Sequence, residues 1–159
     1  MLDYKGITSH LIFSTDSILF IQKTIDAIYD FFEIKDIFPK FEIIIHPEYQ
    51  KDQSTPPEVR NGFIMLCTDL CDGRYAYYQQ ITWQFSHELV HVCKGHIESR
   101  KNWKSFPDDD DEEILAGGIS IWIIKNLCPT YDYKEKYSKT NLDQCEEKAE
   151  SLKYLLHIK

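Results

Sequence analysis

The sequence predicts an α+β fold in which a small sheet packs against a group of helices. The chain has 159 residues, the usual length of one domain, so residues 1–159 are expected to form a single unit. Apolar residues make up 43% of it and aromatic residues 14%, which is enough for a folded core. Two or three short β-type segments lie between one helical pattern near the N-terminus and three helical patterns in the second half.

One helix and one strand are expected in the N-terminal third. Apolar side chains recur at three- or four-residue spacing over residues 16–33, as on the buried face of a helix, and Asp16 or Ser17 can cap its start. Residues 41–46 are rich in β-branched side chains and end before Pro47, which predicts a strand stopped by proline.

A second strand is predicted between two polar segments. Residues 51–60 contain prolines and predict a loop, residues 62–68 predict the strand, and residues 69–73 predict a turn. Residues 75–80 fit either a third strand or the start of a helix, and their pattern does not separate the two.

Three helices are predicted in the second half. Residues 81–94 contain no glycine or proline, and Gly95 is expected to end their helix. A loop over residues 96–107 leads into an acidic run. Because acids favour the positive end of a helix dipole, this run predicts a helix over residues 110–126. Residues 141–157 carry a leucine-rich stripe and predict the last helix.

Composition disfavours several classes of function. The chain has 18 basic and 26 acidic residues, and its net charge of −8 repels nucleic-acid backbones and anionic membranes. Five cysteines, an odd number at wide spacing, favour reduced thiols over a disulfide framework. The N-terminus lacks the features of a secretory signal, and the apolar stretch 117–124 is too short to span a bilayer. We therefore expect a cytoplasmic protein without nucleic-acid or membrane partners.

Residues 85–91 contain the spacing His-Glu-x-x-His. On a helix, His87 and His91 project from the same face, and both imidazoles can reach one Zn²⁺ ion. Glu88 lies beside His87 around the helix, where a carboxylate can take a proton from a metal-bound water. The alternative is a solvated helix with two incidental histidines. The apolar residues at the two variable positions favour a buried site helix instead.

A catalytic zinc site usually has a third protein ligand and an open position. Glu113 is the preferred candidate, because the residues three, four and seven positions after it are small and let its helix lie close to the histidine helix. Glu112 is the second candidate, and its bulkier stripe is typical of ordinary core. Both acids could instead be solvated at a helix start. His96 and Glu98 are the other downstream candidates, and His96 is less favoured because helix geometry turns it away from His87.

These motifs resemble the gluzincin metallopeptidases, which carry His-Glu-x-x-His on one helix and a glutamate ligand on the next. The stretch from Glu113 to Ala116 matches the Glu-x-x-Ala of the small ImmA/IrrE-type zinc peptidases, and the resemblance covers about residues 60–126. The resemblance implies a minimal zincin-like domain that hydrolyses peptide bonds. It assigns Zn²⁺ to His87, His91 and a glutamate, with Glu88 as the general base.

The sequence therefore predicts a zinc-dependent peptidase that acts on a peptide or protein substrate. Its expected ligands are His87, His91 and Glu113, with Glu88 activating water. A different class of function stays open, namely a zincin-fold metal-binding regulatory protein with little or no protease activity. A third hypothesis is a structural metal site completed by His96 or a cysteine. Neither the cleavage preference nor the oligomeric state can be predicted from the sequence.

The cysteines suggest a second zinc site. Cys67, Cys71, Cys93 and His96 together could supply a Cys₃His ligand set. However, Cys67 belongs to a predicted strand and Cys93 to a predicted helix, and buried free cysteines are common. Packing is therefore the competing interpretation for these thiols.

Other residues can be placed around the site in more than one way. Residues 62–68 could form an edge strand that pairs with an extended peptide, or an interior strand without a free edge. Trp83 lies one turn before His87 and fits either a cleft wall or the core. A tetrahedral intermediate needs an oxyanion donor, for which the candidates are Tyr131, Tyr133, Tyr137 and His157.

Overall fold

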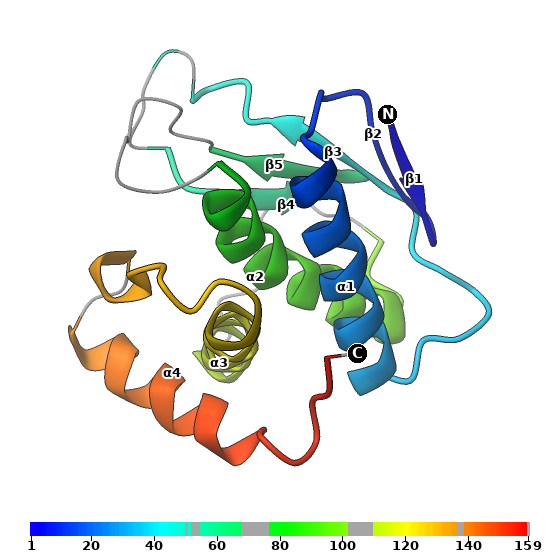
Figure 1. The fold of residues 1–159 in the computed structure, drawn as a ribbon. Helices are drawn as coiled ribbons and strands as arrows, with labels where there is room; N and C mark the ends of the chain where they lie inside the picture. Colours follow the sequence, from blue (N-terminus) through cyan, green and yellow to red (C-terminus); the bar gives the residue numbers. More distant parts are fainter. Residues whose placement is uncertain (50, 52–54, 68–76, 102–109, 137–138, 159) are drawn as a thin grey trace.

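The computed structural model of the chain describes residues 1–49, 51, 55–67, 77–101, 110–136 and 139–158. Within these ranges the chain forms a five-stranded mixed sheet and four α-helices, so the predicted α+β class is confirmed. Figure 1 shows the four helices on one side of the sheet. Residues 85–91, which contain the His-Glu-x-x-His spacing, lie in the second of these helices.

The sheet has the strand order β1-β2-β3-β5-β4. Its strands are β1 Leu2–Tyr4, β2 Ile7–Ser9, β3 Phe41–Ile45, β4 Glu58–Arg60 and β5 Phe63–Leu66. The central pairs β2–β3 and β3–β5 are parallel, and each outer pair is an antiparallel hairpin. Strand β5 is therefore interior. The suggestion that residues 62–68 form an edge strand is wrong, because β4 occupies that edge.

Strands β3 and β5 confirm the two predicted strands, but the two hairpins differ from prediction. The loop predicted over residues 51–60 is wrong at its end, where β4 forms. Both hairpin turns have two residues with positive φ, 49° and 86° at Lys5 and Gly6, and 45° and 88° at Asn61 and Gly62. Type I′ turns favour Asn-Gly, so Asn61-Gly62 is a hairpin signal that the loop prediction does not use.

The helix predicted over residues 16–33 is α1, Thr15–Phe31. Ser14 is its N-cap, and the Oγ of Ser14 accepts the backbone N–H of Ser17 at 3.1 Å. The prediction of Asp16 or Ser17 as the cap is therefore wrong. The cap lies before these residues because a capping side chain must reach a backbone N–H two or three positions further on.

Helix α2 spans Tyr77–Ile97, so the undecided segment 75–80 is helical from Tyr77 onward. The helix also runs past Gly95, and the expected stop at this glycine is wrong. The helix ends in a Schellman motif, in which Ser99 has a left-handed φ of 56° and the N–H of Arg100 donates to the Gly95 carbonyl at 2.8 Å. Gly95 thus supplies a carbonyl to the helix end, while Ser99 makes the turn.

Helix α3 spans Asp110–Leu127, close to the predicted 110–126, and α4 spans Lys139–Ser151. The last helix ends earlier than the predicted 141–157. The chain turns after it, which leaves the Leu155 side chain 63% exposed and Leu156 buried. No helix within the described ranges has both the length and the apolar character needed to cross a bilayer.

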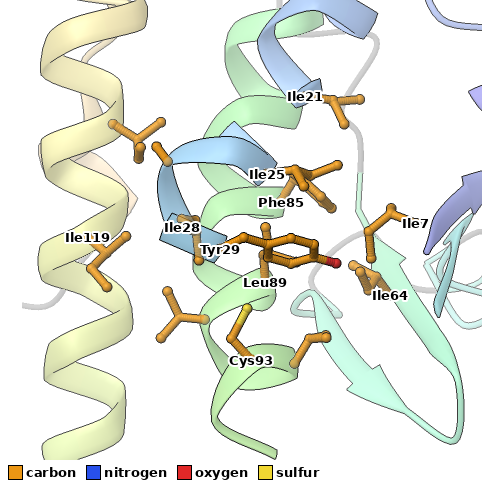
Figure 2. Close-up of a cluster of buried hydrophobic side chains, with 14 of the residues drawn as sticks. Ile7, Ile21, Ile25, Ile28, Tyr29, Ile64, Phe85, Leu89, Cys93 and Ile119 are labelled. Atoms are coloured by element: carbon orange, nitrogen blue, oxygen red, sulfur yellow. The ribbon is translucent and has the colours of Figure 1, made fainter. Parts of the chain in front are cut away.

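The larger apolar core joins α1, α2 and α3 to the sheet. Its members on one side of α2 include Phe85, Leu89 and Cys93, which are four residues apart and fully buried. Figure 2 shows them beside Tyr29 of α1, Ile64 of β5 and Ile119 of α3. Because the core takes this side of α2, His87 and His91 lie on the opposite side of the helix, facing away from the core.

Candidate metal centre

The polar face of α2 presents two histidines to the first turn of α3. The rings of His87 and His91 have centroids 5.3 Å apart. Small side chains join the two helices nearby, since Ser86 Oγ donates to Ser120 Oγ at 3.0 Å and Ser120 Oγ contacts the Trp83 carbonyl at 3.1 Å. Trp83 itself is half-buried against a second apolar cluster, as expected for a core residue. The two helices thus contact each other at Ser86 and Ser120.

Glu113 faces both histidines from the first turn of α3. Its Oε1 lies 2.7 Å from Nε2 of His91, and its Oε2 lies 3.3 Å from Nε2 of His87. Burial by itself would raise the pKa of Glu113, but hydrogen bonds from the two imidazoles hold that pKa well below its usual range. The carboxylate is therefore ionised at neutral pH and offers an anionic oxygen to each ring.

One donor atom from each of His87, His91 and Glu113 lies within 4.8 Å of the others, and the described residues contain no other such group. Two imidazoles and a carboxylate form a ligand set that Zn²⁺ takes in catalytic sites. The side chains of Glu113 and His87 are 47% and 18% exposed, whereas that of His91 is 1% exposed. The group is open to solvent on the Glu113 side and closed behind His91.

Glu112 closes the buried side of this group. Its Oε2 accepts the Nδ1–H of His91 at 2.6 Å, and both side chains are 1% exposed. Burial by itself would lower the pKa of His91, but hydrogen bonds to Glu112 and Glu113 raise it to about 9. Burial would raise the pKa of Glu112, but hydrogen bonds from His91 and Arg100 lower it to about 2. Two adjacent acids thus contact opposite nitrogens of one imidazole.

Glu88 is buried on the same helix as the histidines and is only 4% exposed. Its Oε2 has no hydrogen-bond partner among the described residues. Burial raises the pKa of Glu88 to about 7, against the opposing effect of His87 and His91 and with a further rise from Glu113 and Glu58. A carboxyl group with a pKa near 7 can accept and donate a proton at neutral pH, as general acid–base catalysis requires.

Gln84 and Arg100 belong to the surroundings of the site but were not predicted. The Oε1 of Gln84 accepts the N–H of Cys67 at 2.7 Å, and its Nε2 donates to the Cys67 carbonyl. This pair ties the Glu88 face of α2 to the end of β5. Gln84 lies one turn before Glu88 on the same helix face, and this spacing could have identified it from the sequence. Arg100 gives no such signal, because it reaches Glu112 only through the turn after α2.

The two remaining ligand candidates have other partners. The Nε2 of His96 is 2.9 Å from the carbonyl oxygen of Ile37. Glu98 pairs with Lys94 at 3.2 Å and with Arg100 at 2.8 Å. Neither residue joins the group formed by the two site histidines and Glu113. Within the described ranges, the geometry therefore does not support a site completed by His96.

The described residues do not form the second zinc site suggested by the cysteines. Cys67 Sγ donates to the carbonyl of Thr55 at 2.6 Å, and burial raises the pKa of this thiol to about 12. Cys93 is fully buried in the larger core. Cys71 lies outside the described residues. Packing accounts for Cys93, as the competing interpretation expects.

The four oxyanion candidates have different surroundings. Tyr133 donates its hydroxyl to Glu146 Oε2 at 3.1 Å, and Tyr131 is buried in the second apolar cluster. His157 lines a cavity beside α1. Tyr137 lies outside the described residues. The described contacts do not single out one of them as the donor.

Comparisons with families of known proteins, with curated protein sequences and with solved structures find no match to this chain. The resemblance to gluzincins therefore rests on residue spacing and on the geometry of His87, His91 and Glu113.

Proposed function

We propose that this chain is a zinc-dependent peptidase. The observation that carries the proposal is the convergence of His87, His91 and Glu113 on one point of a helix pair that also buries Glu88. A buried carboxyl oxygen without a partner costs free energy, and such groups concentrate where a protein needs perturbed acid–base chemistry. The order of these residues along two successive helices supports the gluzincin-type interpretation, and the ImmA/IrrE-type interpretation within it.

Each residue has a separate task in the proposed reaction. Nε2 of His87, Nε2 of His91 and a carboxylate oxygen of Glu113 would hold the metal. Zinc bound there would acidify a water molecule and polarise a peptide carbonyl. Glu88 accepts a proton from the attacking water and donates it to the leaving nitrogen, which a pKa of about 7 permits in both directions.

Strand β4 supports a peptide as the substrate. It is the edge of the sheet on the side of β5, and an extended peptide can add to a sheet edge through main-chain hydrogen bonds. Burial is the main cause of the raised pKa of Glu88, but the charge of Glu58 on β4 contributes to it. The charge of this edge strand therefore acts on the proposed base.

Zinc content tests the metal site. We would measure it by elemental analysis of the full-length chain in wild type, Glu113→Ala and Asp110→Ala. We expect stoichiometric zinc in wild type, its loss in Glu113→Ala and its retention in Asp110→Ala. Asp110 is the matched control because it is an exposed acid in the same first turn of α3. If wild type holds no zinc after reconstitution, the proposed metal site is wrong.

Cleavage of a peptide library, followed by mass spectrometry, tests the peptidase activity. We expect cleavage by the zinc-loaded protein that stops on addition of a chelator and is absent in Glu113→Ala. Zinc binding without cleavage of any peptide would contradict the peptidase proposal. That result would favour the metal-binding regulatory protein, which needs the ligands but not the general base.

A further inference from the structure

Arg100 reaches the buried side of the candidate metal centre from outside helix α2. The Schellman motif at the end of α2 reverses the chain, with Ser99 in the left-handed region at a φ of 56°. The N–H of Arg100 is held by the Gly95 carbonyl at 2.8 Å. This turn sets the backbone of Arg100 beside the last turn of the helix, so that its side chain can reach the start of α3.

The guanidinium of Arg100 donates hydrogen bonds to two carboxylates, those of Glu112 and Glu98. Its Nη1 donates to Oε2 of Glu112 at 3.1 Å, and its Nη2 donates to Oε1 of the same residue. Its Nε and Nη2 also donate to Oε2 of Glu98, at 3.2 Å and 2.8 Å. A forked pair of hydrogen bonds fixes the plane of a carboxylate as well as its distance, which a single lysine ammonium cannot do.

The carboxylate of Glu112 is shared between Arg100 and His91. Its Oε2 accepts from Nη1 of Arg100 and from Nδ1 of His91, the latter at 2.6 Å. Because the His91 side chain is 1% exposed, its ring has no room to turn toward solvent. With Nδ1 directed at Glu112, Nε2 is the ring nitrogen that faces Glu113, 2.7 Å away.

The pairing also separates two adjacent acids that both contact the same histidine. Glu112 and Glu113 follow each other in the first turn of α3 and contact Nδ1 and Nε2 of His91, respectively. Arg100 contacts Glu112, whereas Glu113 contacts the two Nε2 atoms. A carboxylate held by a guanidinium is already charge-compensated, so it competes poorly for a cation.

We propose that Arg100 is a positioning residue that acts through Glu112: it fixes the Nδ1–H of His91 and leaves Nε2 of His91 and the carboxylate of Glu113 to the metal. This inference rests on the proposed metal site. Groups behind a metal ligand typically change metal affinity by about 10–100-fold when they are removed. A purely structural ion pair would change the stability of the fold but not the affinity of the folded protein for zinc.

The test compares wild type with Arg100→Ala, Arg100→Lys and a matched control, Lys94→Ala, in the full-length chain. Lys94 pairs with Glu98 at 3.2 Å, so its removal perturbs the same surface network one step further from Glu112. Zinc affinity is measured by competition with a chelator. The imidazole ¹⁵N and Nδ1–H resonances of His91 are followed by NMR in the zinc-loaded protein.

We expect zinc affinity to fall by about 10–100-fold in Arg100→Ala, by less in Arg100→Lys, and by less than about twofold in Lys94→Ala. The Nδ1–H of His91 should exchange faster with solvent in Arg100→Ala and remain protected in the control. If Arg100→Ala does not fold, Arg100→Lys becomes the test. Its ammonium cannot make the forked pair of hydrogen bonds to Glu112, so its zinc affinity should still be lower than that of wild type.

Two contrary results are distinguishable. Wild-type zinc affinity and an unchanged His91 proton in the folded Arg100 variants would overturn the role of Arg100 and leave the metal site in place. Failure of wild type itself to bind zinc would overturn the proposed function, and the positioning role with it.

Discussion

Three glutamates around the site lie in three different environments. Glu113 is half-exposed between two imidazoles, Glu112 is buried between His91 and Arg100, and Glu88 is buried with one oxygen unpartnered among the described residues. Hydrogen-bonding cations lower the pKa of Glu112 to about 2 despite its burial, whereas burial raises the pKa of Glu88 to about 7. The same carboxyl group thus has its pKa shifted in opposite directions by its neighbours.

The substitution Glu88→Gln tests the general base. We expect the variant to keep zinc, because Glu88 is not one of the three converging ligands, and to lose peptide hydrolysis by about 10²–10⁴-fold. The amide has a similar shape but cannot accept a proton. Zinc content and cleavage rate should be measured on the same preparation. A variant that cleaves as fast as wild type would show that another group activates the water.

The ion pair between His91 and Glu112 predicts how the stability of the metal-free protein depends on pH. Its raised pKa means that His91 stabilises the fold fully below about pH 6.5, and that this stabilisation is lost as pH rises through about 9. The lowered pKa of Glu112 has the opposite sign, so its stabilisation is present above about pH 4.5 and lost as pH falls through about 2. The pair contributes most between about pH 4.5 and 6.5.

Urea unfolding in the presence of a chelator measures this dependence. We expect the free energy of unfolding to decrease from pH 6.5 to 9 in wild type, and the decrease to shrink in Glu112→Gln, which lacks the charged partner of His91. Zinc should reverse the trend, because metal binding requires a neutral imidazole and strengthens as pH rises. A metal-free wild type with constant stability over this range would contradict the assignment.

Within helix α2, one face packs into the core and the other presents the site histidines. Phe85 and Leu89 are buried among apolar residues, while His87 and His91 face the start of α3. The 3.6-residue period of the helix accounts for this division, so the two faces can be predicted from the sequence. The ends of the helices cannot be predicted in the same way. Ser14 caps the start of α1 and Ser99 makes the turn after α2 through local hydrogen bonds, which the apolar periodicity does not reveal.

The two type I′ hairpin turns lead to a paired prediction. Gly62 has a φ of 88° and open space where a Cβ would be, so Gly62→Ala should cost only the strain of a left-handed alanine, about 1–2 kcal/mol. Gly6 has a φ of 86°, and a Cβ there would also collide with the carbonyl oxygen of Pro39. Gly6→Ala should therefore cost about 1–3 kcal/mol more, as overpacking does.

Urea midpoints at constant m-value would measure both glycine substitutions. Each variant serves as the control for the other, because both replace the second residue of a two-residue hairpin turn. Equal losses of stability would mean that the close approach of Pro39 to Gly6 does not affect the free energy of unfolding of the Gly6 variant.

In the molecule as a whole, the candidate ligands come from two successive helices that pack against each other. His87 and His91 belong to α2 and Glu113 to α3, so an ion bound by all three would link the two helices directly. Any ligand that binds the folded state alone stabilises that state by mass action. Metal binding should therefore be visible as stability of the entire fold.

Zinc at about 100 times its Kd should stabilise the protein by about 2.7 kcal/mol. In a chain of this size that corresponds to a rise in Tm of about 5–10 °C. Thermal unfolding with zinc and with a chelator measures the difference, and Glu113→Ala is the control that should show little of it. An equal shift in Glu113→Ala would mean that zinc stabilises the protein at another site.

Local sequence patterns were sufficient to predict the α+β class, the helices that carry the candidate site, and the placement of His87, His91 and Glu88 on one helix. These features depend on local periodicity and on residues only a few positions apart, so they can be derived without knowing the fold. The preference for Glu113 over Glu112 was also accessible, as a packing argument from the small residues that follow Glu113.

Contacts between segments distant in the chain are visible only in the folded structure. It showed that Glu112 lies behind His91, that Arg100 holds Glu112, and that β4 rather than β5 is the edge of the sheet. It also separated His96 and Cys93 from the metal group. Each of these contacts forms between elements whose relative position is set by burial of the shared core, and no local pattern specifies that position.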